Sequence, residues 1–395
     1  MRVYLDHNAT TPVDPSVLDA MQPFFSDAYG NASSIHSAGQ RARATVDAAR
    51  TAVAHLVGAK PSEIVFTSGG TEADNLAILG LIDSARAASP RRPHLITTAI
   101  EHHAVLNAAE YAAKQGIDVT FIPVSATGVV DPADIRAALR PETLLISVMH
   151  ANNELGTIQP IEEIASVAAE ADVYFHTDAV QSAGKLPLNV NAMGVDLLTL
   201  SAHKIYGPKG AGALYVRSGT PIVPQMFGGH HERDRRPGTE NVPAIAGFGR
   251  AAELAAQHLA TADESTRIAQ LRDKLEHEIL AAVPGARVND DRAHRVANTT
   301  NISFDGVAGE AFVIALDLLG ISVSTGAACS SGAIEPSHVL RAIGLTDAQA
   351  ESSIRFSLGR FTTAAEIDYV ASTVKATVER MRSLAPAHAA PTPQR

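Results

Sequence analysis

Two residues whose side chains could carry out chemistry lie at or just after the ends of apolar stretches that are typical of buried strands. Lys204 follows Leu197–Ser201, and Asp178 ends the run that starts at Val173. In open α/β sheets, ligands bind beyond the carboxyl ends of the strands. A lysine there can form a Schiff base with a carbonyl compound, and a carboxylate beside a pyridine nitrogen keeps that ring protonated and electron-poor. Gln181 lies three residues after Asp178, within reach of the same pocket. Taken alone, Lys204 is an ordinary surface lysine and Asp178 a helix N-cap.

A glycine turn could supply a phosphate site. The segment from Ile64 to Glu72 is an apolar strand, the pair Gly69-Gly70 with Thr71, and the start of a helix. Backbone N–H groups and the helix dipole at such a turn favour a phosphate. Ser201 and His203 of the lysine segment could add donors. The alternative is a plain strand–helix connection.

Histidines offer a second kind of chemistry. His102 follows the predicted strand that ends near Thr98, and a flat imidazole there could stack on a cofactor ring and move protons. A metal site at His102-His103 is disfavoured because adjacent side chains point apart on a regular element. The run His230-His231-Glu232 invites the same idea. We expect no metal at either place.

Cys329 is the only cysteine, and it lies among small residues between Gly326 and Gly332. Such a run does not form a packed element, so we expect a mobile loop. Structural cysteines normally sit in apolar strands or helices, whereas an exposed polar setting favours a reactive thiolate. Cys329 is therefore a candidate nucleophile.

The elements that position these residues alternate between strands and helices, which indicates an α/β fold with a mainly parallel sheet. The predicted strands are Glu63–Thr67, His94–Thr98, Asp118–Pro123, Leu144–His150, Val173–Thr177, Leu197–Ser201 and Ala213–Val216. Helices are predicted at Glu72–Ser84, Ala104–Gln115, Pro132–Leu139 and Ile161–Ala171.

The pattern changes near residue 250. A helix with Ile268, Leu271, Leu275 and Ile279 on one stripe is followed by strand-like and helical segments at Thr300–Phe304, Glu310–Leu319, Ile321–Ser324 and Ser353–Ser357. We expect a large domain over residues 13–255 and a smaller α+β domain formed by residues 1–12 and 256–384. Residues 385–395 are rich in Pro and Ala, so we expect a disordered tail.

Composition narrows the class of protein. The chain has 395 residues with 46% hydrophobic and 19% charged, and a formal net charge of -10. An acidic surface argues against direct nucleic-acid binding. The N-terminus lacks the apolar core of a signal peptide, and the apolar run Ala311–Val323 is broken by Asp317, which argues against a membrane protein. One cysteine cannot make an internal disulfide, so we expect a cytoplasmic protein.

Sequence motifs in a fixed order now point to a family. They are Tyr4-Leu5-Asp6, Asn8–Pro12, Thr67–Asn75, His150–Gly156, Thr177–Ser182, Ser201–Gly210, Pro237–Thr239, Ser353–Ser357 and Arg360–Thr362. With them the chain resembles the cysteine desulfurases of the NifS/IscS type, within the class V aminotransferase-like enzymes that use pyridoxal 5′-phosphate (PLP). The resemblance implies PLP fold type I. The segment Ser330–Pro336 resembles the long-loop branch of the family.

The resemblance also implies a role for each candidate residue. Lys204 would bind the cofactor covalently, Asp178 would pair with its ring nitrogen, Gln181 would bond its ring oxygen, and His102 would stack on the ring. The phosphate contacts would be Gly70, Thr71, Ser201 and His203, with Thr239 reaching the phosphate of a neighbouring subunit in a homodimer. Asn153 and Arg355 would bind the substrate carboxylate.

The implied reaction converts L-cysteine to L-alanine and leaves the sulfur on Cys329 as a persulfide. An acceptor protein, such as an iron–sulfur cluster scaffold or a component of a thiolation pathway, would take that sulfur. Three alternatives stay open: a class V aminotransferase, which needs Lys204 and Asp178 but not Cys329; a selenocysteine lyase-like enzyme; and a non-catalytic scaffold.

Overall fold

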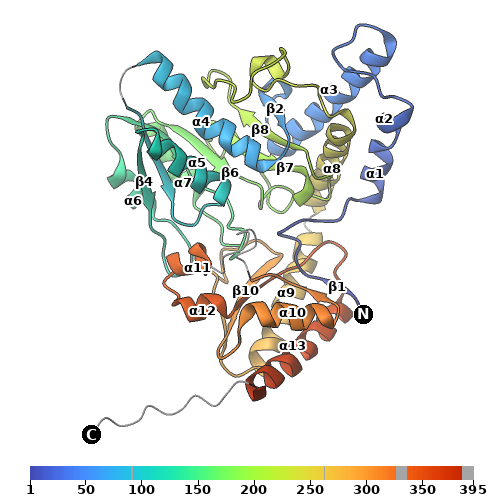
Figure 1. Ribbon diagram of the computed structural model, residues 1–395, viewed down its shortest axis with the longest axis vertical. Helices are drawn as coiled ribbons and strands as arrows, with labels where there is room; N and C mark the ends of the chain where they lie inside the picture. Colours follow the sequence, from blue (N-terminus) through green and yellow to red (C-terminus); the bar gives the residue numbers. More distant parts are fainter. Residues whose placement is uncertain (90–91, 262, 326–335, 385–395) are drawn as a thin grey trace.

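The computed structural model describes residues 1–89, 92–261, 263–325 and 336–384. Its largest element is a seven-stranded sheet in the spatial order β2-β8-β7-β6-β5-β3-β4 (Figure 1). The strands are β2 (Ile64–Thr67), β3 (His94–Thr98), β4 (Asp118–Ile122), β5 (Thr143–Ser147), β6 (Tyr174–Asp178), β7 (Leu197–Ser201) and β8 (Gly212–Val216). Only β8 runs antiparallel to its neighbours, so the predicted mainly parallel sheet is confirmed.

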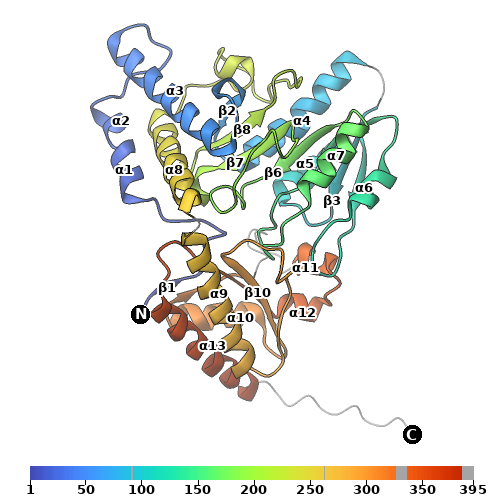
Figure 2. The same ribbon diagram turned by 180° about the vertical axis from the view of Figure 1, so that it is seen from behind.

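Helices bury both faces of this sheet, which explains why its central strands are apolar almost throughout. Along β2, Ile64 and Phe66 pack into one core and Val65 into the other. Helices α4 (Gly70–Ala88) and α5 (His103–Lys114) cover the Val65 face. The opposite face is covered by α1 (Pro15–Met21), α2 (Pro23–Ser26), α3 (Ser37–Val57), α6 (Pro132–Ala138), α7 (Ile161–Glu170) and α8 (Val242–Thr261), of which α1, α3 and α8 lie together in Figure 2.

Helices α6 and α7 begin at the predicted residues, and α5 begins one residue earlier than predicted. The carboxylate of Asp131 accepts a 2.8 Å hydrogen bond from the N–H of Ala133 at the start of α6, and Pro132 occupies the first turn. Helix α4 begins at Gly70, two residues earlier than the sequence pattern indicated. Because Gly70 is already helical, the backbone N–H groups of the first turn of α4 point toward the end of the sheet.

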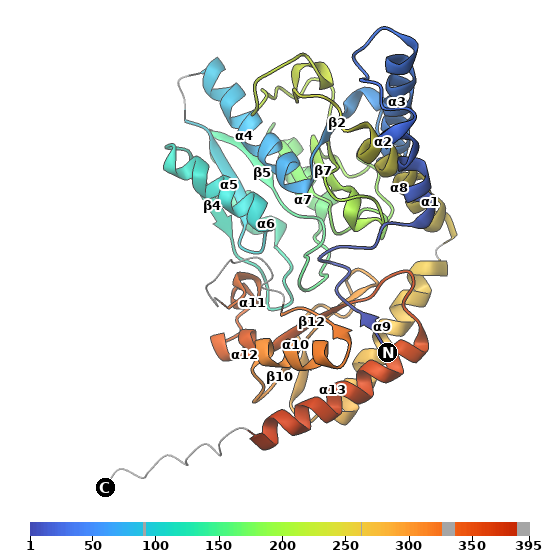
Figure 3. The same cartoon turned by 45° about the vertical axis from the view of Figure 1, so that its right-hand side comes forward.

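The C-terminal part of the chain forms a second apolar core. A three-stranded antiparallel sheet in the order β12-β10-β9 packs against α9 and α13, which run side by side in Figure 3. Its elements are α9 (Asp263–Ala282), β9 (Ala286–Val288), β10 (Thr299–Phe304), α10 (Gly309–Leu318), β11 (Ile321–Ser322), α11 (His338–Ala342), α12 (Asp347–Glu351), β12 (Ser353–Ser357) and α13 (Ala364–Leu384).

The N-terminus joins this second core. Strand β1 (Val3–Tyr4) pairs in parallel with β11, and Val3 and Leu5 are buried against the C-terminal core. Helix α8 continues past residue 255 to Thr261, so the boundary drawn from the sequence falls inside a helix. The division into domains stays a prediction, and residues 385–395 lie outside the described residues. No helix in the described part of the chain is long and apolar enough to cross a membrane.

Replacing Phe304 tests the packing of the second core. The Phe304 side chain is fully buried and packs edge-to-face on Phe312, with 5.1 Å between the ring centroids. Replacing Phe304 by Ala should lower the free energy of unfolding by about 3–5 kcal/mol, because it removes buried area and leaves a cavity. Urea unfolding measures this change. The matched control is Phe227→Ala: Phe227 is 93% exposed, so its loss should change stability by less than about 0.5 kcal/mol. Equal effects of the two changes would contradict this core.

Candidate active site

A cavity of about 400 Å³ opens at the carboxyl ends of β2, β3, β5, β6 and β7. Parallel strands bring residues far apart in the sequence to this one edge. Ten of the predicted site residues line it: Gly70, Thr71, His102, Asn153, Asp178, Gln181, Ser201, His203, Lys204 and Arg355. The structure therefore brings together the predicted amine, carboxylate and phosphate-binding groups.

Lys204 ends the short 3-10 turn η2 (Ala202–Lys204) that follows β7. Its Nζ donates to the backbone oxygens of Asn8, at 2.5 Å, and Ala9, at 2.8 Å. The N-terminal segment is itself fastened to η2, because the N–H and hydroxyl of Thr11 both donate to the carbonyl of His203. The amine is thus held at the cavity by a segment almost 200 positions away in the chain.

Asp178 ends β6 and is buried. Its Oδ1 accepts a 2.8 Å hydrogen bond from the N–H of Val180. Burial raises the pKa of Asp178 to about 6, and this bond and the charge of Lys204 work in the opposite direction. The carboxylate is therefore mostly ionised at neutral pH and can pair with a cation in the cavity.

Two other buried carboxyl groups lie close to Asp178. Burial raises the pKa of Glu101 to about 8, and burial together with the charge of Asp178 raises that of Asp74. Glu101 accepts hydrogen bonds from the hydroxyl of Thr98 at 2.7 Å and the N–H of Met149 at 2.9 Å. Glu101 is therefore mostly uncharged at neutral pH, and ionisation of Asp74 is disfavoured next to the carboxylate of Asp178.

The start of α4 has the features of a phosphate cradle. No side chain caps this helix N-terminus, so its first-turn N–H groups remain available as donors. A Cβ atom at Gly70 would approach Val180 Cγ2 to 2.9 Å, so a larger residue would narrow the space. The hydroxyl of Ser201 is buried with no hydrogen-bond partner among the described residues. An unpaired buried donor beside a helix N-terminus fits an anionic phosphate group.

His102 caps α5 and enters the cavity as a neutral ring. Its Nδ1 accepts a 3.1 Å hydrogen bond from the N–H of Ala104, which leaves the proton on Nε2. Burial, and then the charges of Lys204 and two other histidines, lower the pKa of His102 to about 4. A neutral imidazole is suited to stacking on a flat ring and to donating or accepting one proton.

Arg355 lies on β12 and forms the wall contributed by the C-terminal core. One arm of its guanidinium donates to Asp6 at 2.6 Å, and the other donates to the carbonyl of Asn153 at 2.9 Å. The Nε atom has no partner among the described residues. A carboxylate entering the cavity would meet a fixed cation there, but substrate binding by Arg355 and Asn153 stays a prediction.

Two predicted residues are not among the described residues that line this cavity. Thr239 is exposed and does not line it, so its role toward a neighbouring subunit stays a prediction. Cys329 lies outside the described residues. The two flanks of its segment are at the cavity, however: Ser324 bridges to Arg355 through two backbone hydrogen bonds, and Pro336 is part of the lining.

The structure adds residues to which sequence reasoning gave no role. Asn8, Ala9, Asp74, Glu154, Ser337 and His338 also line the cavity. Asn8 belongs to a motif that carried the family resemblance, but nothing local to it indicates contact with a lysine 196 positions away.

The predicted absence of metal sites concerns two histidine clusters. In the run His230–Glu232, the carboxylate of Glu232 is taken up by a two-armed ion pair with Arg50, at 2.6 Å for each arm. Within the described ranges, no group of three or more His, Cys, Asp or Glu side chains could hold a metal ion.

Known proteins are similar to this chain in sequence and fold. The profile of the family described as "Aminotransferase class-V" matches residues 3–370. A protein of Dictyoglomus turgidum named "Cysteine desulfurase IscS" is 48% identical over 384 residues, covering 97% of this chain and 96% of the relative. The solved structure "NIFS-LIKE PROTEIN" superposes with a TM-score of 0.89 at 37% identity, covering 96% and 100% of the two chains. Another, "SspA in complex with cysteine", gives 0.80 at 38% identity over 91% and 100%.

The fold and the lysine–aspartate cavity thus define an α/β protein with a polar cavity at the carboxyl end of its sheet. The chain belongs to the class V aminotransferase family. Its resemblance to cysteine desulfurases of the NifS/IscS type is confirmed by relatives that carry those names.

The protonation of His102 can be checked directly. Because burial disfavours the imidazolium, the ring should remain neutral from pH 8 down to about pH 5. NMR of histidine-labelled protein, with His102→Gln to assign the signal, reports the titration. A midpoint for His102 near its ordinary value of about 6.5 would contradict the buried position of this ring.

Proposed function

We propose that this protein is a cysteine desulfurase that converts L-cysteine to L-alanine and keeps the sulfur on Cys329 as a persulfide. One observation carries the proposal: Lys204, Asp178 and an uncapped helix N-terminus with the unpaired Ser201 hydroxyl face a single cavity. The relative from Dictyoglomus turgidum carries the name of this activity, and SspA was solved with cysteine.

Pyridoxal 5′-phosphate is the cofactor that this cavity fits. Gly70, Thr71, Ser201 and His203 would hold the phosphate, Asp178 the ring nitrogen, Gln181 the ring oxygen, and His102 a ring face. When bound, the pyridinium ring supplies an electron sink that stabilises negative charge at the substrate Cα. Asp178 is suited to this task because it is buried at the cavity and, with a pKa of about 6, is mostly ionised at neutral pH.

Lys204 performs the proton transfer at the substrate. Its Nζ is already positioned by two backbone oxygens, and it would attach to the cofactor until a substrate amine displaces it. The freed amine then takes the Cα proton and returns a proton to the carbon product. His102, as a neutral ring at the same cavity, would assist these proton transfers.

Arg355 and Asn153 would position the substrate carboxylate at the wall opposite β7. Arg355 is buried and held on two sides, so little side-chain entropy is lost when a carboxylate binds to it. This arrangement selects an amino acid with a free α-carboxylate.

Cys329 takes the sulfur. Its thiolate attacks the sulfur of the bound cysteine, an S–S bond forms, and the Cβ–S bond breaks with its electron pair staying on carbon. Protonation of that carbon gives alanine, so the sum is L-cysteine plus thiol to L-alanine plus persulfide. The described flanks of the Cys329 segment support this role: Ser324 pairs with Arg355, and Pro336 lines the cavity.

The persulfide would pass to an acceptor protein, such as an iron–sulfur cluster scaffold or a thiolation protein. We also propose a homodimer in which the exposed Thr239 serves the phosphate of the partner's site. A cytoplasmic location completes this proposal.

Lys204→Ala tests the lysine. Without the amine, the visible absorption of the cofactor-loaded protein should disappear, and alanine formation should fall by at least about 10³-fold, because one group supplies both the covalent attachment and the proton transfer. Spectra and alanine release measure the two effects. Lys114→Ala is the control, since Lys114 is exposed at the end of α5. Near-normal turnover by Lys204→Ala would overturn the assignment.

Cys329→Ala separates a desulfurase from an aminotransferase. The variant should form neither persulfide nor alanine, because Cys329 is the only thiol in the chain. It should still bind pyridoxal phosphate and change its absorption when L-cysteine is added, since Lys204 and Asp178 are intact. Mass spectrometry of the protein and alanine assays provide the readout. Unchanged alanine production would favour a lyase that breaks the Cβ–S bond without the thiol, and formation of the keto acid of cysteine without persulfide would favour an aminotransferase.

A further inference from the structure

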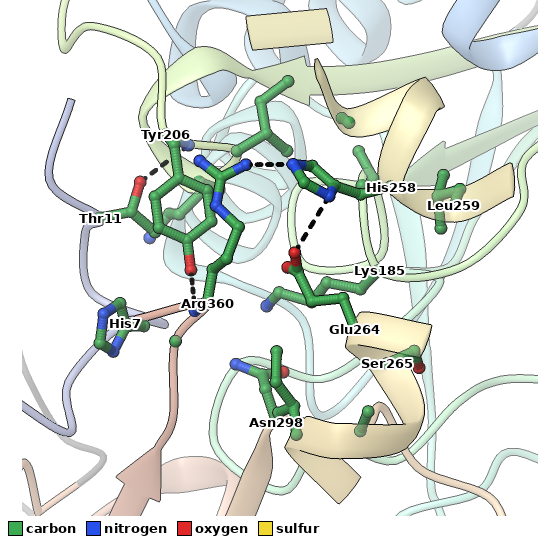
Figure 4. Close-up of a pocket in the computed structure, with 18 of the residues that line it drawn as sticks. His7, Thr11, Lys185, Tyr206, His258, Leu259, Glu264, Ser265, Asn298 and Arg360 are labelled. Atoms are coloured by element: carbon green, nitrogen blue, oxygen red, sulfur yellow. Dashed lines mark hydrogen bonds and ion pairs between the residues drawn. The ribbon is translucent and has the colours of Figure 1, made fainter. Parts of the chain in front are cut away.

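Lys185 is a second lysine at the site, and no part of the proposed reaction uses it. It lies four residues after Gln181, and its Nζ donates to Gln181 Oε1 at 3.0 Å and to Asn8 Oδ1 at 3.2 Å. Its side chain lines a separate cavity of about 210 Å³, together with Asn298, Tyr206 and Arg360 (Figure 4). Lys204 lines both cavities, so it shares the smaller cavity with Lys185.

The Lys185 ammonium determines which way two amides face. When protonated, the Lys185 amine has three donors and no acceptor, so only the oxygen end of an amide can then face it. With its oxygen on Lys185, Gln181 must direct its NH₂ group the other way, and its Nε2 donates to the backbone oxygen of Asn8 at 3.0 Å. Gln181 lines the cofactor cavity, so its remaining N–H is on the side where a ring oxygen would bind.

Asn8 is constrained in the same way. Its Oδ1 accepts from Lys185 and from Asn298 Nδ2 at 3.0 Å, while its Nδ2 donates to the carbonyl of Asn153 and to the hydroxyl of Thr299. With all these bonds made, the peptide oxygen of Asn8 is fixed where it accepts from Lys204.

Burial and repulsion from Lys204 and Arg355 lower the pKa of Lys185 to about 7. Placing a second amine here carries an energetic cost, which a surface lysine would avoid. Its two amide acceptors partly offset that cost.

We propose that Lys185 is a positioning residue: it fixes the amide of Gln181 so that one N–H donates to the backbone oxygen of Asn8 and the other is left for a group in the cofactor cavity, and it fixes Asn8 so that the peptide oxygen meets Lys204. This inference rests on the proposed function, because the group that Gln181 would serve is the ring oxygen of pyridoxal phosphate. The effect of Lys185 on that ring passes through Gln181.

A double-mutant cycle on pyridoxal phosphate binding tests the pathway. The variants are Lys185→Met, Gln181→Leu and the double variant, each prepared without cofactor and titrated with pyridoxal phosphate. Lys185→Met should raise the Kd about tenfold, the expected cost of one misdirected hydrogen bond. It should also shift the pH midpoint of the cofactor's visible absorption in the same direction as Gln181→Leu does. The double variant should be no worse than Gln181→Leu alone.

Further variants distinguish orientation from general damage. Lys185→Arg keeps a donor-only cation and should retain most of the wild-type affinity, whereas Lys185→Gln, which can turn either amide end to its neighbours, should behave like Lys185→Met. Lys114→Met is the matched control and should leave both readouts unchanged. Thermal unfolding of the cofactor-free variants verifies that each is folded.

Three outcomes would overturn the role of Lys185: a wild-type Kd and absorption midpoint in both Lys185→Met and Lys185→Gln, additive effects in the double variant, or a loss in Lys185→Arg equal to that in Lys185→Met. A wild-type protein that binds no pyridoxal phosphate would instead overturn the proposed function itself.

Discussion

A carboxylate that must stay charged away from water governs the layout of this cavity. Burial raises the pKa of Asp178, and a second ionised carboxylate nearby would raise it further. Burial raises the pKa of Glu101 to about 8, so this carboxyl group is mostly uncharged at neutral pH, and burial and the charge of Asp178 raise the pKa of Asp74. Burial lowers the pKa of His176 to about 3, so its ring is neutral and bonds to the hydroxyls of two neighbouring strands. The charge of Asp178 is available to a cation, whether Lys204 or a protonated ring.

The N-terminal segment connects the two cores at the point where this charge is used. Asp6 pairs with Arg355 of the C-terminal core, and Asn8 bonds both Lys204 and Gln181 of the large core. Asn8 is almost fully buried, and each of its polar groups has a partner. A fully satisfied buried network of this kind gives rigidity, because any displaced member leaves a buried polar group unpaired.

Features that depend on a local sequence pattern could be predicted from the sequence. Apolar runs located the strands to within a few residues, and the rule that ligands bind beyond the carboxyl ends of strands was enough to single out Lys204 and Asp178. Asn8 and Lys185 were missed because their contacts join segments far apart in the chain, and neither residue has an unusual neighbourhood. The ion pair between Glu232 and Arg50 of α3, 182 positions away, could not be predicted from the sequence for the same reason. Only the three-dimensional arrangement distinguishes these cases.

The parallel pairing of β1 with β11 has a consequence for biosynthesis. Residues 3 and 4 leave the ribosome more than 300 residues before their partners at 321 and 322. A nascent chain can therefore assemble the large sheet before β11 is available to pair with β1 and before Arg355 is available to pair with Asp6. The wall that carries Arg355 is added last, so an amine able to react with carbonyl compounds acquires its complete surroundings only in the finished polypeptide.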